Sequence, residues 1–137
     1  GEEEIPDLTH LPFLNWSEWM NKLAEFKYGI HLMQTYAAGS FMMNCGYLGI
    51  PCIGYNHTDT QRNIFPDLSI DQDDLETARK LARKLVDDKD FYNECSQKAI
   101  VNFEKHSSET SFNKWKDNFF DKVDDLIDGK ISYIGDY

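Results

Sequence analysis

QTYAAGSFMMNCGYLGIPCIGYN, residues 34–56, places a glycine-marked turn between two apolar segments and thereby decides the fold. The apolar run after the turn predicts a helix from about Ser40 to Leu48, and Gly49 is a typical helix stop. The following PCIGY is a short run of apolar and aromatic residues next to glycines, which predicts a buried strand. A small-residue turn that leads from one strand into a helix, and then into another strand, is typical of α/β proteins.

Three other segments are predicted as strands. LPFLNW (11–16) is a short candidate, KYGIHLMQTY (27–36) has an unbroken apolar centre at Ile30–Met33, and DLSID (67–71) follows a polar loop at 56–66. Continuous rather than alternating apolar strands, separated by helices, are what a parallel sheet covered on both faces requires. The sequence therefore predicts the α/β class, with a parallel sheet and flanking helices.

Helices are predicted before and after these strands. Ser17 is a good N-cap for a helix over 18–26, in which Trp19, Leu23 and Phe26 share one face. Further helices are expected over 74–86, over 90–105 and from Ser108 onward, which makes the C-terminal region helical. Their apolar stripes are predicted to face the core. These stripes are Leu75, Ala78, Leu81, Ala82, Leu85 and Val86; Phe91, Cys95, Ala99 and Phe103; and Phe112, Trp115, Phe119, Val123 and Leu126.

Composition limits the size and the partners of the protein. The chain has 137 residues, 41% apolar and 14% aromatic, which suits one core and a single domain. We expect that domain at 11–128, with 1–10 as a flexible lead-in and 129–137 as a tail. The formal net charge of −10 repels phosphate backbones and anionic lipids, so the sequence predicts no nucleic-acid partner and no docking on an anionic membrane.

Cysteine usage and hydropathy indicate a cytoplasmic protein. Cys45, Cys52 and Cys95 are an odd number of cysteines, and two of them lie in apolar segments, as buried thiols in a reducing compartment do. Neither their spacing nor the four scattered histidines matches a zinc pattern, so no metal site is expected. No window approaches the roughly 18 apolar residues of a membrane span, and the acidic start GEEEIPD is unlike a signal peptide.

The glycine turn is the leading candidate site. Ligands of parallel sheets bind beyond the carboxyl ends of the strands, where each strand turns into its helix. Small residues at 37–39 would let a ligand approach the backbone, Ser40 would cap the helix, and the free N–H groups of its first turn would suit a phosphate. Packing alone explains a glycine at such a turn equally well, and that alternative stays open.

The order of strand, small-residue turn, SFMMNCGYLG helix and GIPCIG strand resembles the nucleotide-sugar half of two-Rossmann-domain (GT-B) glycosyltransferases. The similarity also takes in DTQRNIFPDLSID and DLETARKLARKLVDDKDFY and spans roughly 11–120. It implies a partial, Rossmann-like parallel sheet, incomplete relative to the family. It also implies a nucleotide-diphosphate sugar as donor substrate, with no other cofactor, and an acceptor-binding domain that is missing here.

Site residues follow from the resemblance by position. Gly39, Ser40 and the N–H of Phe41 fall where the family holds the donor diphosphate. Asn44, seven residues before a proline, and Tyr36, eight residues earlier, fall at the two positions of the family's paired glutamates. Both carboxylates are absent from this chain, although asparagine and tyrosine can still form hydrogen bonds with a hydroxyl group.

Two further residues have alternative interpretations. Arg62 could pair with a phosphate or form an ion pair with Asp59 or Asp67. His31 is interpreted as a core histidine, with a ligand contact at the strand end as the alternative. Neither Cys45 nor Cys52 has the spacing expected of a catalytic nucleophile.

The resemblance implies that the chain is the donor-side part of a glycosyltransferase and is inactive alone. The alternative is a non-catalytic α/β interaction or dimerisation module derived from that fold, and an unrelated small α/β regulatory domain is the third. A truncated sheet and an apolar last helix would expose apolar surfaces, so a homo-oligomer is expected.

Overall fold

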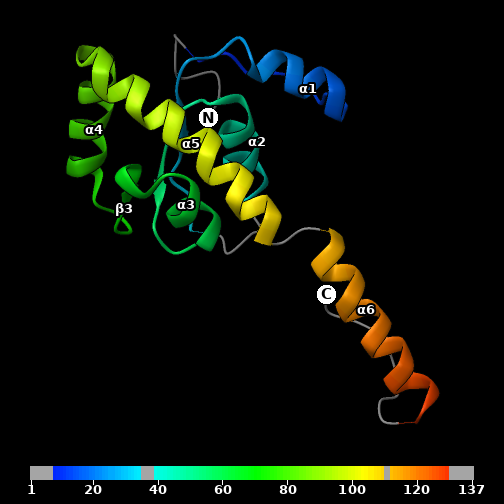
Figure 1. Ribbon diagram of the computed structural model, residues 1–137. Coiled ribbons are helices and arrows are strands. Elements are labelled where there is room, and N and C mark those ends of the chain that lie inside the picture. Colours follow the sequence, from blue (N-terminus) through cyan, green and yellow to red (C-terminus); the bar gives the residue numbers. More distant parts are fainter. Residues whose placement is uncertain (1–7, 35–38, 110–111, 130–137) are drawn as a thin grey trace.

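The computed structural model describes residues 8–34, 39–109 and 112–129, with the backbone alone at 109 and 112–118. Within these ranges the chain is an α/β protein with a parallel sheet in the order β1-β2-β3 (Figure 1). The strands are β1 (Gly29–His31), β2 (Cys52–Tyr55) and β3 (Ser69–Ile70). The helices are α1 (Trp16–Leu23), α2 (Ser40–Leu48), α3 (Asp59–Ile64), α4 (Leu75–Asp87), α5 (Lys89–Glu109) and α6 (Phe112–Ile127), with a 3₁₀ turn η2 at Pro66–Leu68. The predicted α/β class is confirmed.

The helix predicted after the glycine turn is confirmed, including its end. Gly49 adopts a left-handed φ of 69° as the C-cap of α2. Its N–H donates to the Gly46 carbonyl over 3.1 Å, and the Ile50 N–H donates to the Cys45 carbonyl over 2.8 Å. These two bonds form the Schellman pattern, which satisfies the last carbonyls of a helix and favours glycine in the left-handed position. The chain then turns directly into β2.

The central strand β2 is covered on both faces, and β1 is not. All four residues of β2 are buried, whereas β1 lies at an edge of the sheet. Ile30 of β1 pairs with Ile53 of β2 in the parallel register, yet Ile30 is 58% exposed and Ile53 only 3%. The expectation that every apolar strand is covered on both faces is therefore wrong for β1.

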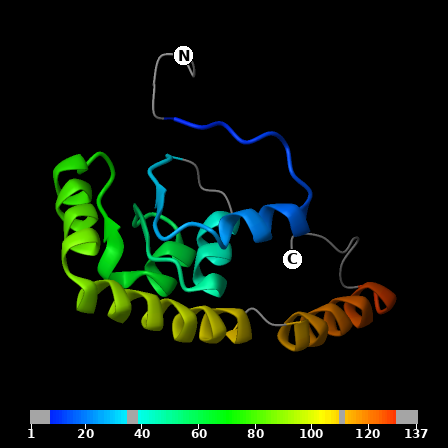
Figure 2. The ribbon, with the colours of Figure 1, turned by 90° about the horizontal axis from the view of Figure 1, so that it is seen from above.

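Helix α5 closes the core by lying across α2, α3 and α4, as Figures 1 and 2 show. Its Cys95 and Ala99 are buried in the core, and Ala78 and Leu85 of α4 join the same cluster, so the predicted stripes of these two helices face the core. The ends of the α4 stripe do not: Leu75 is 47% exposed and Val86 is 63% exposed.

The N-terminal predictions need correction. Residues 11–15 form no strand, and Phe13 is 96% exposed, so its side chain is not packed as that of a sheet residue would be. Asn15 rather than Ser17 caps α1, because its Oδ1 accepts the Glu18 N–H over 2.9 Å. The helix ends at Leu23, and Phe26 lies beyond it, about half exposed.

The last helix differs most from prediction. Figures 1 and 2 show α6 continuing beyond the end of α5, away from the sheet. Its described side chains include Phe119 at 45% and Leu126 at 37% exposure, and none of these side chains belongs to the core cluster. Of the predicted stripe, Phe119 and Leu126 are therefore exposed and Val123 is half-buried, whereas the side chains of Phe112 and Trp115 lie outside the described residues. Helical periodicity reveals an apolar face but not what covers it.

Candidate functional site

Two side-chain hydrogen bonds link the chain beyond the carboxyl ends of the three strands. Gln34, after β1, donates through Nε2 to Asp73 Oδ1 over 3.5 Å. Asn56, after β2, donates through Nδ2 to Asp71 Oδ1 over 2.7 Å. Both aspartates follow β3, so segments far apart in the sequence meet at one edge. This is the edge at which parallel sheets bind ligands.

Gly39 begins the helix at this edge. It is buried, is the N-cap of α2 with φ 82° and ψ 32°, and has no side chain to cap the helix. Its carbonyl accepts the Met43 N–H over 2.9 Å. A β-carbon at position 39 would lie 2.8 Å from Cβ of Thr60 in α3, so the position excludes larger residues by both conformation and packing. The packing interpretation of this glycine is confirmed.

Ser40 is the first residue of α2 and not its cap, which corrects the expected role of its hydroxyl. Its side chain is exposed, and Asn44 is half-buried one turn further on. Residues four apart lie on the same side of a helix, so the Ser40 hydroxyl and the Asn44 amide share one face. The first N–H groups of α2 have no acceptor within the helix and carry its positive dipole end.

The Phe41 side chain belongs to an aromatic cluster. Its ring stacks on His31 of β1, with centroids 5.8 Å apart and an angle of 24°, and lies 6.4 Å from the Trp19 ring of α1. All three side chains are half-buried. His31 is therefore a packed strand-end histidine beside the start of α2, and Phe41 can offer a ligand at this edge its backbone N–H.

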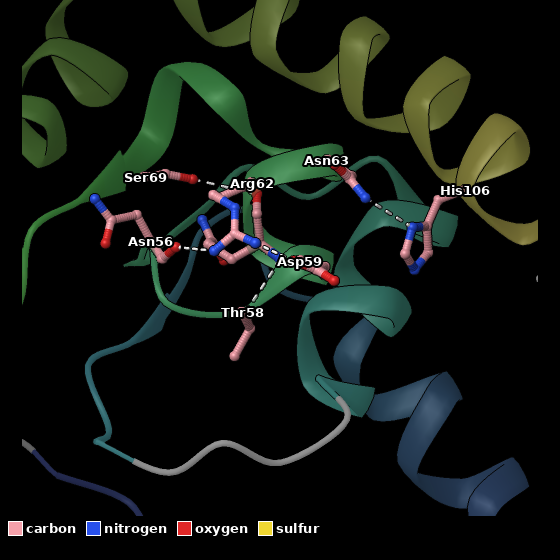
Figure 3. A network of polar contacts seen from close by, with 8 residues as sticks. Asn56, Thr58, Asp59, Arg62, Asn63, Ser69 and His106 are labelled. Atoms are coloured by element: carbon pink, nitrogen blue, oxygen red, sulfur yellow. Dashed lines mark hydrogen bonds and ion pairs between the residues drawn. The ribbon is translucent and has the colours of Figure 1, made fainter. Parts of the chain in front are cut away.

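Arg62 lies on α3, a helix within the segment 56–66 that was expected to be a polar loop. Thr58 caps this helix by accepting the Gln61 N–H over 3.3 Å. Arg62 pairs with Asp59 of the same helix and donates to the Asn56 carbonyl (Figure 3). The ion-pair interpretation with Asp59 is thus confirmed, and a phosphate contact by the exposed guanidinium stays a prediction.

The carboxylates make this edge acidic. Asp59, Asp71 and Asp73 are all exposed, and Asp74 is the N-cap of α4. Two hydrogen bonds from Thr77 hold the pKa of the Asp74 carboxyl below its usual range, because its Oδ1 accepts the Thr77 N–H and its Oδ2 the Thr77 hydroxyl. These carboxylates would repel an anion bound at this edge. For an anion to bind here, the attraction of the α2 dipole and of Arg62 must exceed that repulsion.

Several contributors were not identified from the sequence. The Tyr55 hydroxyl donates to Asp73 Oδ1 over 3.5 Å, and Asp73 has a left-handed φ of 65°. The sequence signal that could have identified Asp73 is the acidic run after the predicted last strand, because aspartate is one of the residues that tolerate a left-handed turn. Gln61 was also missed: it is fully buried, and its Nε2 donates to the Cys52 and Leu68 carbonyls over 3.0 and 3.4 Å.

The structure therefore brings together at one edge Gly39, Ser40 and the Phe41 backbone, with Asn44 one turn into α2. Arg62 belongs to α3, whose Thr60 touches Gly39, and Tyr36 lies outside the described residues. Among the described residues, no group of three or more His, Cys, Asp or Glu side chains is arranged to hold a metal ion. No helix in the described ranges has the length and apolar character to cross a membrane.

Comparison with known proteins identifies no relative: no family profile, no curated protein and no solved structure matches the chain.

Proposed function

We propose that the chain is the donor-side part of a glycosyltransferase and binds a nucleotide-diphosphate sugar at the start of α2. The observation that carries the proposal is the left-handed Gly39 N-cap, which leaves the first turn of α2 without a side-chain cap at the carboxyl edge of a parallel sheet. Uncapped N–H groups and a helix dipole stabilise bound phosphate oxygens. The exposed Ser40 hydroxyl adds a hydrogen bond beside them.

The same groups would assist transfer of the sugar. The nucleoside diphosphate leaves with added negative charge, which the N–H groups of Ser40 and Phe41 and the Arg62 guanidinium would stabilise. The anomeric carbon would face an acceptor hydroxyl in a cleft completed by an acceptor-binding domain outside these 137 residues. A general base, where the reaction uses one, would also come from that domain. The chain alone would bind the donor without turning it over.

Asn44 would contact the donor ribose, since its amide lies one turn beyond Ser40 on the same face of α2. An asparagine both donates and accepts hydrogen bonds, so it can replace a carboxylate in holding a hydroxyl group. It cannot carry a negative charge toward the sugar. The proposal therefore assigns Asn44 to binding alone.

Substitution of Ser40 tests the proposal with little risk to the fold. An aspartate at the first helical position is compatible with the dipole of α2, but its charge repels a diphosphate. Calorimetry with uridine, guanosine and adenosine diphosphates should show weak binding to the natural chain for at least one of them. That binding should survive in Ser40→Asn and be lost in Ser40→Asp. Equal binding by both variants, or no binding of any of the three to the natural chain, would refute the proposal.

A second candidate function is a non-catalytic interaction module, and the uncovered Ile30 favours it. The Gly29 N–H donates to the Pro51 carbonyl, so Gly29 faces β2. In a parallel ladder the next residue, Ile30, directs its N–H and carbonyl toward the free edge. Among the described residues no strand pairs with this edge of β1, and an unpaired edge beside an exposed apolar side chain is a typical site for strand addition. Ile30→Thr keeps the strand preference and removes apolar surface. A partner protein that binds through β1 should therefore fail to bind this variant and should still bind Ser40→Asp.

A further inference from the structure

A groove of about 410 Å³ is lined by the last turn of α2 and the second half of α5. Tyr47 contributes from α2. The α5 residues are spaced three and four apart, so they share one face of that helix. They are Ile100, Phe103, Glu104, Ser107 and Ser108. The volume of this groove, which we call the α2–α5 groove, falls within the range of small-molecule sites, roughly 300–1,000 Å³.

Close packing of α5 on two glycines of α2 forms the groove. A β-carbon at Gly46 would lie 3.2 Å from Cβ of Phe103, and one at Gly49 would lie 2.9 Å from Cδ1 of Ile100. The Ser96 hydroxyl of α5 also donates to the Gly49 carbonyl over 2.6 Å. These contacts hold the two helices together, so the groove is formed without a ligand, as most small-molecule sites are.

Two aromatic rings line the groove, one from each helix. The centroids of the Tyr47 and Phe103 rings are 5.7 Å apart, and their planes are inclined by 69°. Tyr47 is 62% exposed and Phe103 is half-buried. The face of an aromatic ring carries partial negative charge and attracts cations. Because the rings are inclined, their faces have different orientations within the groove.

Glu104 gives the groove a negative charge. Its carboxylate forms no hydrogen bond or ion pair within the described part of the chain, and the Ser108 hydroxyl donates to the Glu104 backbone carbonyl instead. The neighbouring basic residues do not line the groove. Lys105 is exposed beside it, and His106 is directed toward α3, where its Nδ1 lies 3.3 Å from Nδ2 of Asn63 (Figure 3). The groove therefore suits a cation.

The lining favours an organic cation over a metal ion. Ca²⁺ and Mg²⁺ need about six oxygen ligands, and the groove has one carboxylate. A quaternary ammonium group is weakly hydrated, and its methyl groups can pack on aromatic rings while its charge interacts with them. Ile100, which is 43% exposed, adds an apolar contact for those methyl groups.

We propose that the α2–α5 groove binds a small quaternary ammonium compound, with Tyr47 and Phe103 against its methyl groups and Glu104 opposite its charge. The groove lies at the last turn of α2, whereas Gly39 begins the first turn. The proposal therefore does not depend on nucleotide binding at the start of that helix.

An NMR titration of the isotope-labelled 137-residue chain with choline tests the site. Choline should bind weakly, with a Kd of roughly 1 mM or above, and should shift the amide signals of Tyr47, Phe103 and Glu104. Its neutral analogue, in which carbon replaces the charged nitrogen, has nearly the same shape. This analogue should bind at least about threefold more weakly, because it lacks the charge. No binding of choline, equal binding of the analogue, or shifts confined to residues outside the groove would overturn the proposal.

Variants with matched controls identify the groups that bind. Tyr47→Leu removes one ring and Glu104→Gln removes the charge, so each should weaken choline binding about two- to fivefold. Tyr47→Phe keeps the ring, and Glu76→Gln removes an exposed carboxylate from α4 instead, so both should bind as the natural chain does. All three positions are exposed, and circular dichroism establishes that each variant is folded.

Two comparisons between these variants decide the outcome. Choline binding by Glu104→Gln that equals binding by Glu76→Gln would overturn the proposal, because the groove carboxylate would then contribute nothing specific. Equal binding by Tyr47→Leu and Tyr47→Phe would overturn it as well, because the aromatic ring would then have no part in recognition.

Discussion

Gly39 lies against Thr60 so closely that a β-carbon at position 39 would be 2.8 Å from the threonine Cβ and 3.0 Å from its Cγ2 and Oγ1. The glycine that opens α2 therefore also joins α2 to α3. Because Arg62 and Asp59 lie on α3, this contact fixes the candidate anion-binding helix start relative to the charged side chains nearby.

Gly39→Ala should destabilise the protein by about 2–4 kcal/mol, because it adds crowding against Thr60 to the strain of a positive φ. Gly129→Ala is the matched control: Gly129 has a φ of 77°, but no atom of the described residues lies within 4 Å of the place that a β-carbon would take there. That variant should lose about 1–2 kcal/mol, the cost of the left-handed conformation for an alanine. Urea unfolding measures both, and equal losses would contradict the packing contribution.

Gly54 and Gln61 should be energetically coupled. A methyl group at position 54 would lie 2.5 Å from Gln61 Oε1, so Gly54→Ala should cost about 2–3 kcal/mol. Gln61→Ala removes the donor to the Cys52 and Leu68 carbonyls and is also destabilising. The double variant should lose at least about 1 kcal/mol less than the two single losses together, because the clash is absent. Additive losses in urea unfolding would argue against this steric link.

The Cys95 thiol should lower stability at alkaline pH. Burial, followed by the negative charges of Asp67 and Glu94, raises its pKa from 9.0 to about 11. Above pH 9 the unfolded chain loses this proton while the folded chain keeps it, so the free energy of unfolding falls until the pH reaches about 11. Cys95→Ala should show a smaller decrease across this window in urea titrations. If the free energy of unfolding fell equally with pH in both proteins, the Cys95 thiol would be excluded as the cause of the alkaline loss of stability.

Asp74 should contribute stability that is lost in acid. Its pKa is lowered by the hydrogen bonds from Thr77, so its contribution is present above the ordinary value of 3.8 and disappears as the pH falls through the lower folded-state value. Asp74→Asn retains a capping side chain but should abolish this part of the acid dependence, whereas Asp74→Ala loses the cap at neutral pH as well. Thermal unfolding at neutral and acidic pH distinguishes these outcomes. An asparagine variant with unchanged acid sensitivity would assign the effect to other carboxylates.

The elements that could be predicted are those whose local signals agree with their packing. Gly49 ends α2 by its conformation alone, and the apolar run of β2 is buried on both faces as its sequence indicates. Helix α3 was missed because Thr58 and Asp59 suit a turn and a helix start equally well. Exposed apolar surface was expected at a truncated sheet and at the last helix, but the sequence does not specify that Ile30 in particular is exposed, since this depends on which elements lie beside it.

The candidate site was predicted only in part, for a related reason. The helix start at Gly39 has a local signal, because glycine and small residues mark a turn where backbone is accessible. The neighbours of that turn come from distant segments: Thr60 touches the glycine, and Asp73 receives hydrogen bonds from Gln34 and Tyr55. Those contacts depend on strand order and register, which single-sequence patterns do not specify.

The position of α5 has a consequence for how the chain folds during synthesis. The strands pair in chain order, so each new strand can pair with the one before it once the helix between them has been made. The core nevertheless cannot be completed before α5 is made, because Cys95 and Ala99 of α5 pack against the helices that precede it. A nascent chain that has not yet exposed residues 89–109 would therefore carry its apolar helices uncovered, as a target for chaperones, and would acquire protease resistance in a single late step.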